Sequence, residues 1–235
     1  MNKSKNEKFL DPNLKNKSKT VEEKIQLYEF NGNMLPLPTE IEISESGTCN
    51  RSCSFCPRSA PDFVDKKEFI KNSLHEKLCV ELQELNYKGT IRYSGFVEPM
   101  LDKNIFNLIS MVRNYLPESN IEMVTNGDPL NLKRLKKLFE HGLNKVLISS
   151  YDGKMETEKL EEMCVKANLD PSQYMVRHRY YSEDQDFGIT LSNRSGLMTN
   201  TEFKIEPLKE PLKNPCYIPS YTFFLDYQGD VLMCP

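Results

Sequence analysis

The order of strand-like and helix-like segments is the feature of this 235-residue chain that most restricts its fold. From about residue 38, short apolar runs alternate with segments whose apolar residues have helical spacing. The strand-like segments are Thr39–Ser44, Thr90–Ser94, Ile121–Thr125, Lys145–Ser149, Tyr174–Tyr180 and Gly188–Ser192. Such alternation predicts an α/β fold with a parallel sheet, either open or closed into a barrel. In both cases, functional side chains follow the carboxyl ends of the strands.

Four segments between these strands are predicted to be helices. Asp65–Glu68 has the pattern of a capping box that opens the first helix, and Gly142 is expected just after the end of the third. The apolar faces include Leu74, Leu78, Leu82, Ile105, Leu108, Val112, Leu132, Leu135, Leu138, Leu160 and Met163. Cys79 and Cys164 lie on or beside two of these faces, so both are predicted to be small hydrophobic residues of the core.

Composition and charge exclude several classes of protein. The 31 Lys and Arg residues against 34 Asp and Glu residues give a net charge of -3, which argues against a nucleic-acid partner. No apolar run is long enough to span a membrane, and Met1–Thr20 has no signal-peptide core. A cytoplasmic protein is therefore predicted. The first twenty residues are rich in Lys, and we expect 1–37 to be a flexible tail and a lead-in to the sheet.

Seven cysteines are unusual for a cytoplasmic protein, where thiols serve as metal ligands or reactive groups more often than in disulfides. Cys49, Cys53 and Cys56 follow the first predicted strand with C-x3-C-x2-C spacing. A structural zinc site closes with four ligands, and no fourth Cys or His lies nearby in sequence. A [4Fe–4S] cluster held by three thiolates keeps one iron free for a substrate or cofactor. The alternatives are a zinc knuckle completed by a distant residue and cysteines without a common role.

With Phe55 before the third cysteine, this loop resembles the C-x3-C-x-Φ-C signature of the radical S-adenosylmethionine (SAM) enzymes. The resemblance implies a partial (β/α)6 TIM-like barrel over residues 38–200 and a [4Fe–4S] cluster on Cys49, Cys53 and Cys56. It also implies that SAM chelates the free iron through its amino and carboxylate groups. Reductive cleavage of SAM then yields a 5′-deoxyadenosyl radical that abstracts a hydrogen from the substrate.

Further motifs follow in the order that the family has them. The turn from Gly95 to Glu98 is similar to the Gly-Glu-Pro motif that contacts the methionine amino group, with Val97 in place of a glycine. Asn126 belongs to a turn similar to the family's Thr-Asn-Gly, and Ser150 to one similar to Ser-x-Asp-Gly, whose serine binds the ribose or carboxylate of SAM. Without the resemblance, Glu98 would be a cap of the next helix, and Ser150 part of a helix N-terminal turn.

Arg177 and Arg179 are two residues apart on the fifth predicted strand and therefore share one face. Inside a barrel, their guanidinium groups would suit a carboxylate or phosphate of SAM or of the substrate. On the outside, they would be solvated charges. The sequence alone favours neither alternative.

Cys216 and Cys234 bracket a predicted β-hairpin whose turn contains Gly229. Their spacing resembles the start of a SPASM or twitch extension, in which such a hairpin supplies two ligands of an auxiliary [4Fe–4S] cluster. Residues 201–235 are therefore expected to be a C-terminal β-hairpin extension that ends within its metal-binding motif. Either the chain is a fragment of a longer protein or the auxiliary site is incomplete.

These features together predict a radical SAM oxidoreductase or modifying enzyme. The resemblance implies a small, carbohydrate-type substrate or a peptide, and a reductant such as flavodoxin or ferredoxin. The alternative is a non-catalytic iron–sulfur or zinc-binding protein that uses the same thiolates.

Overall fold

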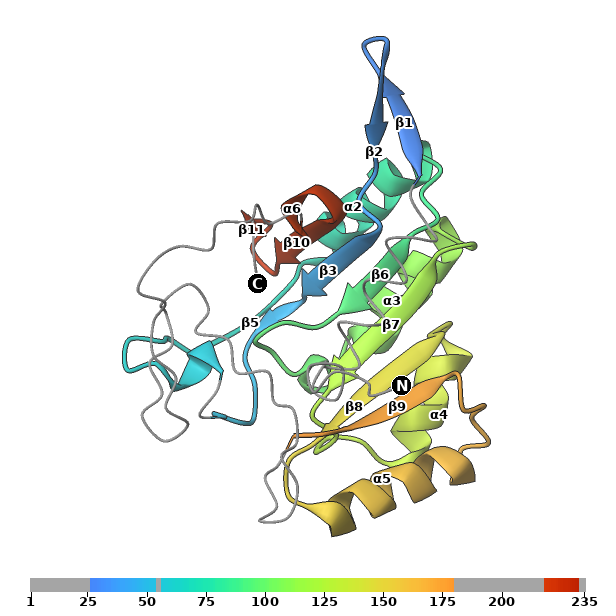
Figure 1. Cartoon of the computed structure of the whole chain (residues 1–235). Coiled ribbons are helices and arrows are strands. Elements are labelled where there is room, and N and C mark those ends of the chain that lie inside the picture. The colour runs from blue at the N-terminus through green and yellow to red at the C-terminus, as the bar shows by residue number, and fades with distance from the viewer. Residues whose placement is uncertain (1–25, 54–55, 180–217, 233–235) are drawn as a thin grey trace, which may run out of the picture.

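A seven-stranded sheet forms the centre of the computed structural model, which describes residues 26–53, 56–179 and 218–232 (Figure 1). The spatial order is β11-β10-β3-β6-β7-β8-β9. The strands are β3 (Glu40–Ser44), β6 (Thr90–Tyr93), β7 (Asn120–Thr125), β8 (Lys145–Ser150), β9 (Tyr174–His178), β10 (Thr222–Asp226) and β11 (Val231–Leu232). Neighbouring strands are parallel except for β10 and β11, which are antiparallel. The predicted α/β class with a parallel sheet is confirmed.

The first five predicted strands correspond to β3, β6, β7, β8 and β9, with their ends shifted by a residue or two. The sixth predicted strand, Gly188–Ser192, lies outside the described residues. A different segment extends the sheet, because β10 pairs in parallel with β3 at the opposite edge from β9, with Thr222 opposite Glu40. Part of the predicted C-terminal extension thus joins the main sheet, following the short helix α6 (Ile218–Tyr221).

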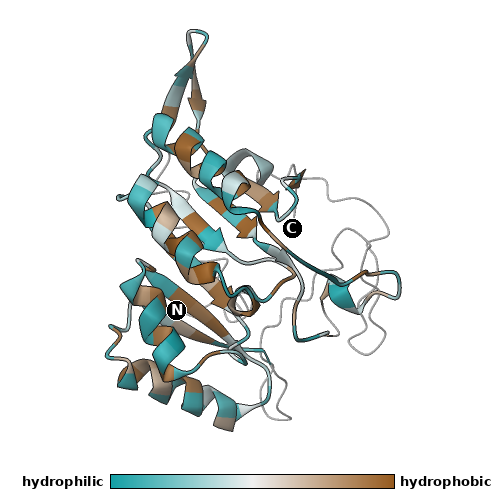
Figure 2. Cartoon of the chain, turned by 180° about the vertical axis from the view of Figure 1, so that it is seen from behind, coloured by the Kyte–Doolittle hydropathy of each residue, from teal (hydrophilic) through white to brown (hydrophobic). Residues whose placement is uncertain are grey.

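Four helices gather on one face of this sheet (Figures 1 and 2). They are α2 (Asn72–Glu84), α3 (Ile105–Tyr115), α4 (Leu132–Glu140) and α5 (Lys154–Lys166). Alternate strand residues meet them in one apolar core that includes Ile41, Ile43, Ile91, Tyr93, Ile121, Met123, Val146 and Ile148. Cys79 and Cys164 are buried in this core as predicted. Gly142 follows α4 with φ 109°, which confirms its predicted place after the helix.

The opposite face of the sheet is polar because the other strand positions carry charged side chains. Arg92 on β6 is 1% exposed and forms ion pairs with Glu40 on β3 (2.5 Å) and Glu122 on β7 (2.7 Å). Burial opposes the charge of Glu122, but Arg92 outweighs it, and the pKa of Glu122 is lowered. Both sides of the sheet are thus buried, one by apolar packing and one around paired charges.

The predicted capping box at Asp65–Glu68 is wrong. Residues Lys66–Phe69 form strand β5, which pairs antiparallel with β4 (Ser46–Gly47), and α2 begins only at Asn72. The Asp65 carboxylate accepts a hydrogen bond from Thr48 and pairs with Arg58 instead of capping a helix. Pairing with a segment twenty residues away overrides the local helix signal here, and it closes the loop that carries the cysteines.

The lead-in to the sheet contains a hairpin that we did not expect from the sequence. Strands β1 (Leu27–Phe30) and β2 (Asn33–Pro36) are joined by Asn31 and Gly32, with φ 49° and 77°. An Asn-Gly pair with two positive φ values is the turn that two-residue hairpins favour, so a signal was present. Gln26 anchors its base by donating to Asn86 O (2.7 Å).

Across the described ranges, no helix is both long and apolar enough to cross a membrane.

Arg92→Met tests the charged face of the sheet. We expect it to lower the free energy of unfolding by about 3–5 kcal/mol, because Glu40 and Glu122 would stay buried without the arginine charge. Urea unfolding at pH 7 measures this loss. Lys88→Met is the matched control, since it removes only an exposed pair with Glu118 and should cost less than about 1 kcal/mol. Equal stability of the two variants would contradict this description.

Candidate functional site

The three clustered cysteines lie in the loop between β4 and β5, beyond the carboxyl end of β3. Cys49, Cys53 and Cys56 are half-buried thiols that form no disulfide. The Cys56 N–H donates to Cys53 O (2.9 Å), and a 3-10 turn (Pro57–Ser59) follows directly. The backbone thus holds Cys56 close to Cys53, and the charges of both Cys49 and Cys56 act on Cys53.

Burial raises the pKa values of two of these thiols. The pKa of Cys53 is raised to about 11, first by burial and then by the neighbouring charges of Cys56 and Cys49. Burial also raises the pKa of Cys49. Cys49 and Cys53 are therefore protonated at neutral pH in the free chain, and a metal that binds them must displace their protons.

Two donors point at the sulfur of Cys49. The backbone N–H of Arg51 lies 3.4 Å from Cys49 Sγ, and Asn126 Nδ2 lies 3.8 Å from it. Hydrogen bonds to thiolate sulfur are a usual feature of iron–sulfur sites. The other cysteines among the described residues, Cys79 and Cys164, are far from this loop in the core. Three thiols, one of which has two donors directed at its sulfur, fit a cluster with three protein ligands.

Gly95 follows β6 with φ 119°, and a Cβ there would lie 2.0 Å from Ser44 Oγ. Only glycine can therefore occupy this position. Gly95 itself is exposed, while Phe96 and Val97 are half-buried. The turn thus presents its backbone, rather than a large side chain, beside the cysteine loop.

The carboxylate of Glu98 is buried and fully engaged. It accepts hydrogen bonds from Thr125 Oγ1 (2.6 Å), Asn126 N (2.6 Å) and Met100 N (2.9 Å). The bond from Met100 caps a 3-10 helix (Pro99–Leu101), which is the structural alternative considered for Glu98. The bonds from Thr125 and Asn126 join the end of β6 to the end of β7. Glu98 thus holds the turn after β6 against the end of β7. Contact of the turn with SAM stays a prediction.

Ser150 ends β8 and is fully buried. Its hydroxyl donates to Glu156 (2.8 Å) and accepts from Thr157 (2.9 Å). Glu156 also accepts from the backbone N–H groups of Tyr151 and Asp152. The Ser150 hydroxyl thus bonds to the first turn of α5, which agrees with the predicted alternative of a helix N-terminal turn. Its contact with SAM stays a prediction.

The two arginines predicted on the fifth strand differ in burial, although both charges act on the Tyr151 side chain. Arg177 is buried opposite Ser149 of β8 and donates to Ser149 Oγ (2.8 Å), on the polar face away from the helices. Of the two predicted alternatives, this placement agrees with a guanidinium directed toward the interior rather than with a solvated charge. Arg179 follows β9, is half-buried, and its N–H donates to Ser150 O (2.7 Å). Cys216 and Cys234 lie outside the described residues.

Arg51 is a site residue that the sequence analysis missed. Its guanidinium makes paired hydrogen bonds with Asp128 (2.6 and 2.5 Å), which follows β7, and with Asp152 (2.9 and 2.7 Å), which follows β8. It also lies over the Tyr151 ring at 5.0 Å. The sequence did contain a signal for this contact. An arginine lies between two of the cysteines, and an aspartate lies in or directly after each of the two later motifs.

Glu45 is a second such residue. It lies between β3 and β4, is fully buried, and neither carboxylate oxygen has a hydrogen-bond partner among the described residues. Burial raises its pKa to about 8, and the nearby Asp102 and Glu98 carboxylates add to the rise. Glu45 is therefore mostly protonated at neutral pH.

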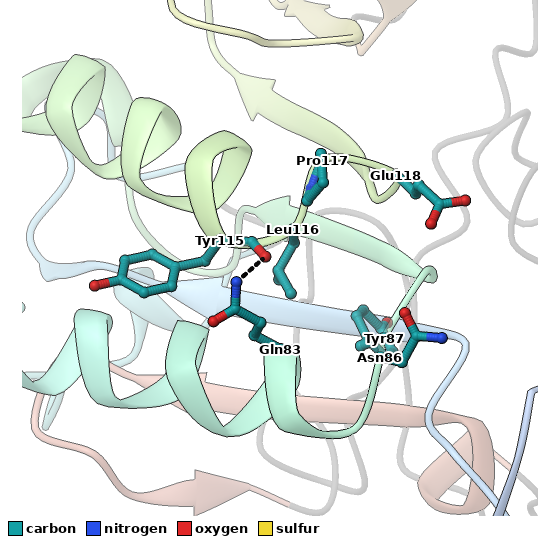
Figure 3. A pocket seen from close by; sticks show the side chains of 7 residues that line it. All are labelled: Gln83, Asn86, Tyr87, Tyr115, Leu116, Pro117 and Glu118. Atoms are coloured by element: carbon teal, nitrogen blue, oxygen red, sulfur yellow. Dashed lines mark hydrogen bonds between the residues drawn. The ribbon is translucent and has the colours of Figure 1, made fainter.

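A surface pocket lies at the other end of the molecule (Figure 3). It is lined by Gln83, Asn86, Tyr87, Tyr115, Leu116, Pro117 and Glu118. The loops that form it precede β6 and β7, whereas the cysteine loop lies beyond strand carboxyl ends. Gln83 Nε2 donates to Tyr115 O across it (3.2 Å). The pocket is therefore separate from the candidate site.

The chain matches no protein-family profile, but it has curated relatives. It is 28% identical over 195 residues to the S-adenosyl-L-methionine-dependent 2-deoxy-scyllo-inosamine dehydrogenase of Niallia circulans, a match that spans 83% of this chain and 72% of the relative. It is also 30% identical over 122 residues to a probable GTP 3′,8-cyclase of Thermococcus kodakarensis, but this match spans only 38% of that protein.

Solved structures show the same fold. The crystal structure of BtrN in complex with AdoMet and 2-DOIA superposes with a TM-score of 0.68 and 27% identity, over 86% of this chain and 74% of that one. An open conformation of BtrN superposes with a TM-score of 0.56 and 23% identity, which is a likeness of fold. The parallel sheet and its helices thus have a counterpart in a protein solved with SAM.

Glu45→Gln tests the buried carboxyl. The folded chain keeps Glu45 protonated up to about pH 8, whereas the unfolded chain releases the proton near pH 4.5. The free energy of unfolding should therefore fall as pH rises through this window, by up to about 5 kcal/mol from this group. Glu45→Gln should remove most of that fall in urea unfolding between pH 5 and pH 8. Glu84→Gln, at an exposed position of α2, is the control, and a pH dependence unchanged by Glu45→Gln would refute the assignment.

Proposed function

We propose that this chain, a homologue of the radical SAM enzymes, reductively cleaves SAM and uses the 5′-deoxyadenosyl radical to take a hydrogen atom from a substrate C–H bond. The observation that carries the proposal is the placement of the cysteine loop. Cys49, Cys53 and Cys56 stand together beyond β3, and hydrogen bonds tie their loop to the ends of β7 and β8. Parallel α/β folds bind their ligands at this edge.

Cys49, Cys53 and Cys56 would hold a [4Fe–4S] cluster, which supplies, when bound, the electron that cleaves SAM. The chain contributes the three thiolates and two donors toward Cys49 Sγ, from Arg51 N and Asn126 Nδ2. These donors stabilise the thiolate form against the burial that raises its pKa.

The turn after β6 would receive the methionine end of SAM. The exposed backbone at Gly95 offers carbonyl oxygens to an amino group, and the buried Glu98 carboxylate keeps the turn in place. Asn126, Ser150 and the two arginines at the end of β9, Arg177 and Arg179, would complete the site around the ribose and carboxylate. Arg177 suits the carboxylate because its guanidinium already points away from the helices.

The substrate that we propose is a small, carbohydrate-type molecule rather than a peptide, on the strength of the dehydrogenase relative. The dehydrogenase relative acts, by its name, on 2-deoxy-scyllo-inosamine, a compound of this chemical class.

Oxidation of an alcohol to a carbonyl removes the abstracted hydrogen atom, the hydroxyl proton and one electron. The chain then needs an electron acceptor, and Cys216 and Cys234 remain the predicted ligands of an auxiliary [4Fe–4S] cluster. A flavodoxin or ferredoxin would supply the electron that starts the reaction.

Anaerobic reconstitution with iron and sulfide, followed by dithionite and SAM, tests the proposal. We expect 5′-deoxyadenosine from the native chain and none from the triple variant with Cys49, Cys53 and Cys56 changed to Ala, because three thiolates are lost. Cys164→Ala is the control, since Cys164 is buried in the core on α5, and its product should be retained. Chromatography quantifies the nucleoside.

If the reduced native chain binds iron but forms no 5′-deoxyadenosine, the protein is a non-catalytic iron–sulfur protein. Product formation by the triple variant would show instead that the cluster lies elsewhere in the chain.

A further inference from the structure

We propose that Arg51 is a positioning residue, which locks the cysteine loop onto the ends of β7 and β8 and so sets where the cluster ligands stand. The inference rests on the proposed function, because it concerns the same three thiolates. It goes beyond that function by assigning the preorganisation of the site to one side chain of the cysteine loop that is not itself a cluster ligand.

The contacts of Arg51 reach two other strands at once. Its guanidinium uses one edge for Asp128 and another for Asp152, with all four distances between 2.5 and 2.9 Å. Charge-assisted, bidentate pairs of this kind are the strongest that a side chain makes. The side chains of Arg51 and Asp128 are 20% and 29% exposed, so water screens their pair less than a surface pair, whereas Asp152 is 63% exposed and its pair is screened more.

Three carboxylates surround the Arg51 guanidinium, and its positive charge offsets their mutual repulsion. Oxygens of Asp128, Asp152 and Glu156 lie within 4.8 Å of one another, and Glu156 Oε1 is 3.7 Å from Arg51 Nη2. The Glu156 carboxylate accepts hydrogen bonds from Ser150 and from two backbone N–H groups, so its position in this carboxylate cluster is fixed. Without a cation between them, these carboxylates would repel one another and release the loop.

Arg51 is well placed to transmit this constraint to the thiolates. It lies two residues from Cys49 and two from Cys53, and its own N–H donates to Cys49 Sγ (3.4 Å). Asn50 reinforces the lock by donating to Asp128 (2.7 Å) and accepting from Asn126 (2.7 Å). Asn50 and Arg51, which lie between Cys49 and Cys53, are therefore both bonded to the segment that follows β7 before any cofactor binds. Ligand groups held in advance bind at a lower entropic cost.

Arg51→Met and Arg51→Lys separate the geometry of this lock from its charge. Methionine keeps the length but loses the charge, whereas lysine keeps the charge but cannot form two bidentate pairs. Arg113→Met is the matched control, because Arg113 also makes several hydrogen bonds, to Gly142, Pro117 and Asn144, but far from the cysteine loop.

Three measurements are made on the full chain. Hydrogen exchange of a peptide covering residues 48–53 is recorded before iron is added, with the β8 peptide as internal reference. After reconstitution, the rate at which a chelator removes iron and the midpoint potential of the cluster are measured. The exchange measurement is independent of SAM cleavage, so its result stands even if the native chain forms no 5′-deoxyadenosine and the proposed function fails.

In Arg51→Met we expect loop exchange and iron loss to be at least about tenfold faster, with β8 exchange unchanged, and a lower midpoint potential because a positive charge is lost. Arg51→Lys should show faster exchange and iron loss but a potential close to that of the native chain. Arg113→Met should change none of the three. Native exchange and iron retention in Arg51→Met would overturn the proposal, and so would equal effects in Arg113→Met.

Discussion

Parallel pairing of β3, β6, β7 and β8 is the constraint on which the candidate site depends. Because these strands are parallel and adjacent, their carboxyl ends meet at one edge of the sheet. Segments far apart in sequence, around Cys49, Gly95, Asn126 and Ser150, therefore lie next to one another. The strands alone would leave these loops free, and two side chains, the buried Glu98 and the partly exposed Arg51, join them. Glu98 ties the turn after β6 to the end of β7, and Arg51 ties the cysteine loop to β7 and β8.

The two faces of the sheet differ in the side chains that they bury, which are apolar on one face and charged on the other. The helical face holds the apolar core, in which Tyr93 and Ile148 pack against the helices. The other face carries the ion pairs of Arg92 and the side chain of Arg177, all of them buried, at the cost of burying charge.

The sequence predicts the parts of this arrangement that depend on local pattern. Strand and helix periods placed β3, β6, β7, β8 and β9 and the helices α3 to α5, and cysteine spacing singled out the loop after β3. The first helix began later than predicted because β5 pairs with β4, a contact that no local pattern encodes. Arg51 and the orphaned carboxyl of Glu45 escaped notice for a similar reason, since their roles come from neighbours supplied by other strands. Ser150 shows the same limit, because its motif is present while its hydroxyl serves α5.

The central claim is that the cysteine loop holds a cluster whose free iron binds SAM. Electron paramagnetic resonance of the reconstituted, reduced chain, recorded with and without SAM, tests it most directly. The account predicts a [4Fe–4S] signal that changes when SAM is added, because the amino and carboxylate groups of SAM would occupy the iron that no cysteine binds. A cluster signal that is identical with and without saturating SAM would contradict it.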